Sequence, residues 1–160
     1  MNKQQNLYDV IKDFGTAMLV THGPGGDMHA RPMAVAQLKP NADTYFATSI
    51  ESPKIAELEE NPRALVLFQS KSQFAALHGA ARIVRDRSLI DKLWSETWRV
   101  WFPGGKDDPT LCILKVDATE GEYWDTSGMQ GLKFAFEGLK AIVQGRQAEK
   151  DEMQHAKVAL

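Results

Sequence analysis

The chain begins with a helical pattern of hydrophobic residues and then changes to patterns typical of β-strands. Four apolar residues recur at helical spacing and predict an amphipathic helix that ends near Gly15; they are Leu7, Val10, Ile11 and Phe14. Short apolar or alternating segments follow, many of them bounded by Gly, Pro, Asn or Asp. They predict strands over residues 16–21, 29–38, 44–47, 63–69, 74–84, 110–116 and 120–126. The segment 63–69 is almost wholly apolar, so we expect it to be buried on both faces.

Two further helices are expected among these strands. Ser52 is a suitable N-cap and Pro53 a suitable first helical residue, so a short helix should run until residues 61–62. A longer helix should begin near Asp86, with an indole-rich apolar face formed by Leu89, Leu93, Trp94, Thr97, Trp98 and Trp101. We interpret Trp94 and Trp98 as core residues, and we expect such a face to need a deep groove or a partner.

The end of the chain shows one more helical pattern. Its apolar positions are Leu132, Phe136, Leu139 and Val143, and they predict a last amphipathic helix before a charged, frayed tail. We therefore divide the chain into a strand-rich domain, residues 1–130, and a C-terminal amphipathic helix and tail, residues 131–160. No internal repeat or long linker is present in the sequence.

Composition narrows the classes of function. The formal net charge is -2, from 19 basic and 21 acidic side chains, which does not suit a protein that binds nucleic acid. No apolar run approaches the roughly 18 residues of a membrane span, and the first residues lack the apolar core of a signal peptide. The single cysteine, Cys112, has apolar neighbours and is expected to be a buried thiol. These features predict a soluble cytoplasmic protein without a membrane partner.

Residues 29–54 carry the most suggestive chemistry. Arg31 lies in an expected strand, while Thr48, Ser49 and Lys54 lie around the expected helix start at Ser52. Helix N-termini offer unpaired backbone N–H groups and a favourable dipole, so an anion can bind there. An arginine, hydroxyls and a lysine around such a start suit a phosphorylated, planar, partly polar ligand.

Other kinds of site find little support in the sequence. The histidines, His22, His29, His78 and His155, fall on different elements without metal-ligand spacing, so no metal site is predicted. No Ser/His/Asp or Cys/His set can be assembled, and no catalytic side chain is assigned. If the protein is an enzyme, a cofactor must supply the redox chemistry.

Several motifs together resemble a known family. They are Arg31-Pro32-Met33, Thr48-Ser49, Ser52-Pro53-Lys54, Glu60-Asn61-Pro62-Arg63, the stretch Trp-Phe-Pro-Gly-Gly-Lys-Asp-Asp-Pro at 101–109, and Glu122-Tyr123-Trp124. This set resembles the flavin-binding split β-barrel family that includes pyridoxamine 5'-phosphate oxidase, and in particular its general stress protein 26-like branch. The resemblance implies a mainly β fold with flanking helices, built as a six-stranded split β-barrel. It also implies a homodimer that holds FMN in the clefts between its two subunits.

The resemblance assigns roles to individual residues. Arg31 and its strand would run along the isoalloxazine and ribityl chain, and Thr48, Ser49 and Lys54 would meet the phosphate. The implied cofactor-binding residues are Arg31, Pro32, Met33, Phe46, Thr48, Ser49, Lys54, Trp101 and Trp124. Trp101 and Trp124 are candidates because a flavin ring packs well against a flat neighbour.

The sequence also departs from the oxidase. Ala36 or Gln37 stands near the place of a phosphate-binding lysine, and Pro53 replaces an arginine beside Lys54. Residues 131–160 hold no counterpart of the oxidase's C-terminal arginine segment, so pyridoxamine 5'-phosphate oxidation is not expected. The hypothesis is an FMN-dependent oxidoreductase with an unknown small-molecule substrate. The alternatives are a non-catalytic flavin-binding or flavin-buffering stress protein, and a barrel that uses FAD, a deazaflavin or haem.

Overall fold

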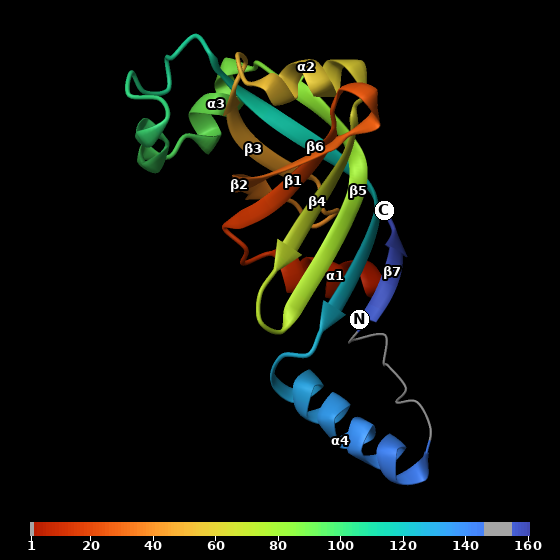
Figure 1. Cartoon of the computed structure of the whole chain (residues 1–160). Helices are drawn as coiled ribbons and strands as arrows, with labels where there is room; N and C mark the ends of the chain where they lie inside the picture. Colours follow the sequence, from red (N-terminus) through yellow and green to blue (C-terminus); the bar gives the residue numbers. More distant parts are fainter. Residues whose placement is uncertain (1, 146–154) are drawn as a thin grey trace.

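The computed structural model describes residues 2–145 and 155–160, and seven β-strands in this part form one antiparallel sheet. The strands follow the order β3-β2-β1-β4-β5-β6-β7, and β3 also pairs with β6. This extra pairing closes β1 to β6 into a six-stranded barrel, as Figure 1 shows. Their bounds are β1 Thr16–His22, β2 Met28–Leu38, β3 Thr44–Ser49, β4 Arg63–Gln69, β5 Gln73–Val84, β6 Leu111–Asp125 and β7 His155–Ala159. The predicted mainly β barrel is therefore confirmed.

Buried and more exposed side chains alternate along the strands, as expected for a barrel with a filled interior. In β4 the buried residues Ala64, Val66 and Phe68 point inward, while Leu65 and Leu67 between them are half-buried. The prediction that this apolar segment is buried on both faces was wrong, because a barrel strand has one inner and one outer face. Side chains from all around the barrel fill its interior, among them Leu19, Phe46, Leu77, Leu114 and Tyr123.

Helices cover the ends and the outside of the barrel. Helix α1 (Lys3–Ile11) contributes the fully buried Leu7 and Ile11 to the main core, as its apolar spacing predicted. Helix α2 (Pro53–Glu60) follows β3 and precedes β4 in the chain, and its side chains Ile55 and Leu58 are buried. A second cluster, formed by Tyr45, Ile90, Trp98, Phe102, Leu111 and Ile113, lies under helix α3 (Arg87–Leu93).

The indole-rich segment is not the single helix that its spacing predicted. Helix α3 ends at Leu93, and a separate 3-10 helix, η2 (Glu96–Val100), follows it. The helix is interrupted at Trp94, which has an extended ψ of 135°, and the side chain of Ser95 caps the start of η2. Trp98 is buried, while Trp94 is half-buried and packs edge-on against Trp98. The expected core role is therefore confirmed for Trp98, whereas Trp94 packs against the second cluster from its partly exposed side.

Strand β6 also differs from expectation, because the two predicted strands at 110–116 and 120–126 are one strand of 15 residues. Its first part pairs with β3, its second part pairs with β7, and β5 runs along most of it. A register shift in the β5–β6 pairing lies between His78 and Gly79. At Gly79 a Cβ atom would overlap the carbonyl oxygen of Asp117, so this close approach of two backbones requires glycine.

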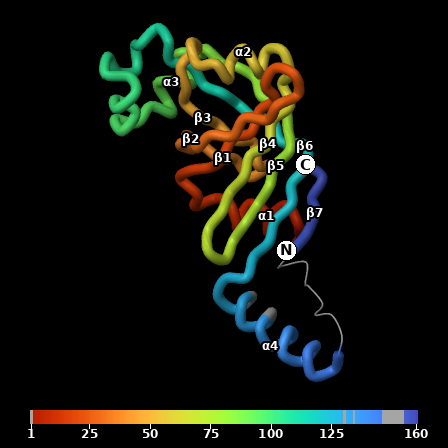
Figure 2. The backbone as a smooth tube through the Cα atoms, viewed as in Figure 1, coloured from red at the N-terminus to blue at the C-terminus, as the bar shows by residue number. Residues whose placement is uncertain are grey.

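Helix α4 (Gly128–Gln144) projects from the end of the barrel, as Figures 1 and 2 show in blue. It begins three residues before the predicted start. Part of the expected frayed tail, residues 146–154, lies outside the described residues, but residues 155–159 form β7 and pair with β6. None of the helices in the described residues is long and apolar enough to cross a membrane.

Candidate functional site

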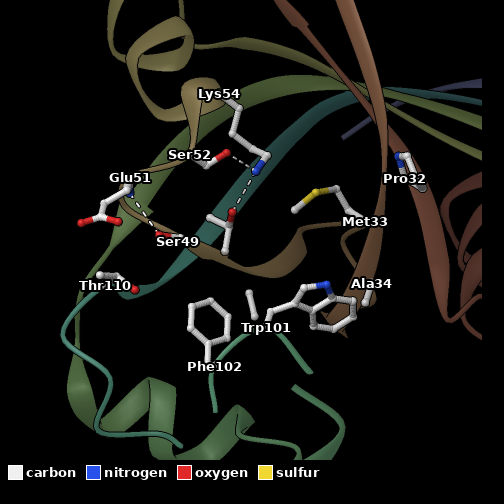
Figure 3. Close-up of a pocket in the computed structure, with 12 residues that line it drawn as sticks. Pro32, Met33, Ala34, Ser49, Glu51, Ser52, Lys54, Trp101, Phe102 and Thr110 are labelled. Carbon is white, nitrogen blue, oxygen red and sulfur yellow. Dashed lines mark hydrogen bonds between the residues drawn. The ribbon is translucent and has the colours of Figure 1, made fainter. Parts of the chain in front are cut away.

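A pocket of about 480 Å³ lies beside the start of α2, where β2 and β3 approach the segment after η2. Its volume falls in the range of roughly 300–1,000 Å³ that small-molecule sites occupy. Figure 3 shows the side chains that face it. The lining residues are Pro32, Met33, Ala34, Ala47, Thr48, Ser49, Glu51, Ser52, Lys54, Trp101, Phe102 and Thr110.

Lys54 supplies the positive charge of this pocket. Its Nζ donates hydrogen bonds to Thr48 Oγ1 at 2.9 Å and to Ser52 Oγ at 2.6 Å (Figure 3). Within the described part of the chain, no carboxylate forms an ion pair with this ammonium group. Burial lowers the pKa of Lys54, and the nearby charge of Arg31 lowers it further. Among the described residues, this half-buried cation is therefore hydrogen-bonded only to hydroxyl groups, an environment that favours a bound anion.

The start of α2 adds backbone groups to the same place. Ser52 occupies the N-cap position that the sequence predicted, with Pro53 as the first helical residue. The Ser52 hydroxyl accepts the hydrogen bond from Lys54 and makes no side-chain capping bond. Ser49 supports the turn before the helix, because its Oγ accepts a hydrogen bond from the Glu51 backbone N–H at 3.2 Å. Lys54 thus lies at the positive end of the helix dipole, and its ammonium group contacts the hydroxyls of Thr48 and Ser52.

The rest of the pocket wall is apolar and aromatic. Pro32 and Met33 come from β2, and Trp101 and Phe102 come from the segment that follows η2. Phe102 is buried in the cluster under α3, whereas Trp101 is 63% exposed. Cys112 is fully buried near this site, with its Sγ 3.4 Å from the carbonyl oxygen of Thr48. Burial raises the pKa of its thiol, so the expectation of a buried thiol is confirmed.

Arg31 lies in the strand that lines the pocket, but its guanidinium group is tied to a neighbouring polar network. It donates to Thr21 Oγ1 at 2.6 Å and to Glu57 Oε2 at 3.1 Å. The Thr21 hydroxyl donates to the same carboxylate oxygen, and His29 Nδ1 lies 2.5 Å from the other one. The hydrogen bond from Thr21, followed by those from His29 and Arg31, lowers the pKa of Glu57. The network joins β1 and β2 to α2, one helical turn after Lys54.

The structure gathers six of the nine residues that the sequence assigned to the cofactor: Pro32, Met33, Thr48, Ser49, Lys54 and Trp101. Phe46 points into the barrel core and has no exposed surface. Trp124 lies near the end of β6, where it pairs with Phe74 in β5 and stacks on His155 of β7. It is separated from Leu111, which pairs with Ser49 beside the pocket, by most of a strand of 15 residues.

Sequence reasoning did not assign the remaining lining residues to the site: Ala34, Ala47, Glu51, Ser52, Phe102 and Thr110. Ser52 was identified as the helix cap, although its hydroxyl binds Lys54 instead. Ala34 and Ala47 carry no chemical signal of a site. Thr110 Oγ1 donates to Asp108 Oδ1 at 2.7 Å, only two positions earlier, in the turn that leads into β6.

The closed antiparallel barrel, with a pocket beside the start of α2, has the architecture of the split β-barrel class of proteins. The chain belongs to the pyridoxamine 5'-phosphate oxidase like family, whose model matches residues 2–149. General stress protein 26 of Bacillus subtilis is 32% identical over 125 residues, which are 73% of this chain and 86% of that protein. The family and branch predicted from the sequence motifs are therefore confirmed.

Two solved structures extend the comparison. A putative general stress protein 26 from Jannaschia sp. has a TM-score of 0.74 and 26% identity, with 97% of this chain and 96% of that chain covered. The general stress FMN/FAD binding protein from Xanthomonas citri has a TM-score of 0.66 and 32% identity, with 78% of this chain and 89% of that chain covered. The latter is described as binding FMN or FAD.

Proposed function

We propose that this chain is a cytoplasmic, homodimeric flavoprotein that binds FMN without a covalent bond and acts as an oxidoreductase on a small molecule. The observation that carries the proposal is the half-buried Lys54 ammonium, which lies at the start of α2 and donates hydrogen bonds to the hydroxyls of Thr48 and Ser52. A phosphate dianion there would restore the charge balance that burial disturbs. Riboflavin offers no such group, and FAD offers a diphosphate.

The wall opposite Lys54 fits the rest of a flavin. Met33 and Pro32 form one apolar side, and Trp101 offers an indole face. An apolar wall with a few polar groups is the usual composition of a small-molecule site. The bound flavin would supply the electron transfer, while the chain binds the phosphate, orients the ring and limits its contact with water. The Xanthomonas citri relative, described as an FMN/FAD binding protein, supports this choice of cofactor.

A homodimer would account for the position of Trp124, if this residue contacts the flavin as the family resemblance implies. Within one chain it lies far along β6 from the pocket, so it would reach a flavin there only from a second copy. A two-fold axis that brings opposite ends of two barrels together would place Trp124 of one copy near the pocket of the other. Flavin held in the clefts between subunits is consistent with this geometry.

The test is a titration of the purified chain with FMN, FAD and riboflavin, followed by flavin fluorescence and tryptophan emission. We expect FMN to bind with quenching of its fluorescence, and riboflavin to bind more weakly because it lacks the phosphate. Absorbance spectra of the protein as purified would identify FAD, a deazaflavin or haem in place of FMN. Unchanged fluorescence with all three flavins would overturn the proposal.

A flavin store without turnover is the second candidate, and one feature of the pocket favours it. No histidine or cysteine is among its lining residues in the described part of the chain, so proton transfer would rest on other groups. Turnover of reduced nicotinamide by the FMN-loaded protein separates the two. Reduction of the bound flavin at catalytic rates supports an oxidoreductase, and a flavin that stays oxidised supports the store.

A further inference from the structure

Strand β4 carries apolar side chains on its outer face. Leu65 and Leu67 lie there, although a strand with one face in water normally places polar residues on that face. The neighbouring strands continue this surface. The register places seven apolar side chains in two rows across β2, β1, β4 and β5: Pro32, Met18, Leu67 and Ala76 in one row, and Ala30, Val20 and Leu65 in the next. We call these seven side chains the β4 face.

The chain covers one apolar outer surface of the barrel and leaves the β4 face open. On β3 and β6, Tyr45 and Ile113 are buried under α3. On the β4 face, Met18 is 38% exposed, and Ala30 and Pro32 are exposed as well. In Figure 1, α2 lies above β1, β4 and β5, α4 lies below them, and no helix of the described residues crosses in front of the strands between. The β4 face therefore lacks the cover that α3 gives to the other surface.

The β4 face begins at the pocket and ends beside Trp124. Pro32 belongs to the face and also lines the pocket, and Ala34, the next residue on the same side of β2, lines it too. At the other edge of the face, Phe74 of β5 is 37% exposed and pairs with Trp124 of β6. One continuous surface thus runs across the sheet from the pocket of a chain to Trp124 of the same chain.

We propose that the β4 face packs on the β4 face of a second copy, about a two-fold axis that passes near Leu67. Such an axis exchanges the two edges of the surface, so Phe74 and Trp124 of one copy would lie beside Pro32 and the pocket of the other. Each pocket would then be completed by the partner. This inference rests on the homodimer proposed above and deepens it, because it names the surface and the axis of that dimer.

The size and composition of the β4 face suit a dimer. Four strands about 4.8 Å apart, over about 20 Å of strand length, present roughly 400 Å² of flat area in each copy. Exposed apolar patches of about this size usually mark interaction sites. Two copies would form an apolar centre of roughly 800 Å², and polar neighbours such as His22, Arg63 and His78 would extend it toward the roughly 1,200 Å² of a specific interface.

Helix α4 is a weaker candidate for this contact. It also exposes apolar side chains, among them Leu132, Phe136 and Leu139. However, it projects beyond the end of the sheet, and none of its described residues lines the pocket. A dimer held by α4 alone would leave the β4 face of both copies in water. Two sheet faces, in contrast, pack on each other about 10 Å apart and bury both.

Charge substitutions test which surface forms the dimer. Met18→Lys should raise the dissociation constant of the dimer by about a hundred-fold in sedimentation equilibrium, because it places an unpaired charge in the centre of the contact. Gln4→Lys, on the exposed side of α1, and Phe136→Lys, on α4, add the same charge elsewhere and should leave that constant unchanged. An unchanged dimer in Met18→Lys, or a dissociated one in Phe136→Lys, would overturn the proposal.

Cross-linking tests the axis without adding a charge. Met18→Cys and Phe74→Cys are co-expressed as chains with tags of different length and treated with a short bismaleimide. An axis near Leu67 places these two positions opposite each other, so we expect a cross-linked species that contains both tags. The parent chain is the control, since its single cysteine, Cys112, is fully buried. Absence of the mixed species would overturn the proposed axis.

The same samples separate this contact from the proposed function. A parent chain that binds FMN but sediments as a monomer would overturn the contact and leave flavin binding standing. A mixed cross-linked dimer that binds no flavin would overturn the proposed function and leave the contact standing.

Discussion

The guanidinium group of Arg31 donates to Oε2 of Glu57 at 3.1 Å, which ties strand β2 to helix α2. Both side chains are largely buried, at 23% and 10% exposure. Glu57 lies one helical turn after Lys54, so this pair fixes the helix that presents the lysine to the pocket. Arg31 thus contributes to the site by positioning α2, the helix that carries Lys54.

Replacement of Glu57 should change how the free energy of unfolding depends on pH, because it removes the ion pair with Arg31. The folded protein lowers the pKa of Glu57, so its contribution is complete above the unfolded value of about 4.3 and is lost as the pH falls through the lower folded value. Glu57→Gln should reduce the free energy of unfolding at pH 7 by about 1.5–3 kcal/mol. Urea unfolding between pH 3 and 7 should show the two proteins converging below about pH 4. A constant difference over that range would show that the charge of Glu57 is not the cause.

Removal of the Lys54 side chain should weaken the binding of FMN but not that of riboflavin. A charge-assisted hydrogen bond contributes roughly 1.5–3 kcal/mol, so Lys54→Ala should weaken FMN by about ten- to a hundred-fold. Riboflavin affinity should barely change, and the salt dependence of FMN binding should flatten. Lys71→Ala, at an exposed turn position before β5, is the matched control and should affect neither flavin. Equal weakening of both flavins would place the phosphate elsewhere.

Trp101 should give the opposite pattern. Because its indole lines the apolar part of the pocket, Trp101→Ala should weaken FMN and riboflavin alike, by about 0.5–1.5 kcal/mol. Trp101→Phe keeps a flat ring and should recover most of that loss. Calorimetric titration with both flavins measures the effect. A loss confined to FMN would show that Trp101 acts on the phosphate and not on the ring.

The register shift at Gly79 gives a prediction about stability alone. A methyl group there would collide with the backbone of β6 at Asp117, which cannot move without breaking the pairing of β5 and β6. Gly79→Ala should lower the free energy of unfolding by about 2–3 kcal/mol. Gly15→Ala, where an added methyl group meets no atom within 4 Å, should change it by less than about 0.5 kcal/mol. Denaturant midpoints of the two variants provide the comparison.

The sequence predicted the elements whose signals are local. The Ser52-Pro53 helix start and the apolar run of β4 depend on neighbouring residues, and the structure has α2 and β4 where they were expected. The break between α3 and η2 was missed, because the helical spacing of Trp94, Trp98 and Trp101 continues through it. Strand β7 was missed because the residues that it pairs with in β6 lie 31 to 39 positions earlier in the chain.

The candidate site was predictable where charge and hydroxyls mark it. Lys54, Thr48 and Ser49 carry such a signal, and the structure brings them together at one pocket. The pairing of Arg31 with Glu57 was not foreseen, since it joins a strand to a helix across 26 positions. Alanines such as Ala34 line the pocket through their place on a strand, and composition gives no sign of that role.

The pairing of Trp124 with His155 makes β6 and β7 adjacent strands, so α4 belongs to a long connection between two neighbours in the sheet. Such a connection can be lengthened, exchanged or deleted while the strands on either side keep their hydrogen bonds. Helix α4 can therefore change without altering the pairing of the barrel strands. During evolution, the surface that α4 offers to a partner could change independently of the pocket at Lys54, so one barrel could keep its ligand and acquire new associations.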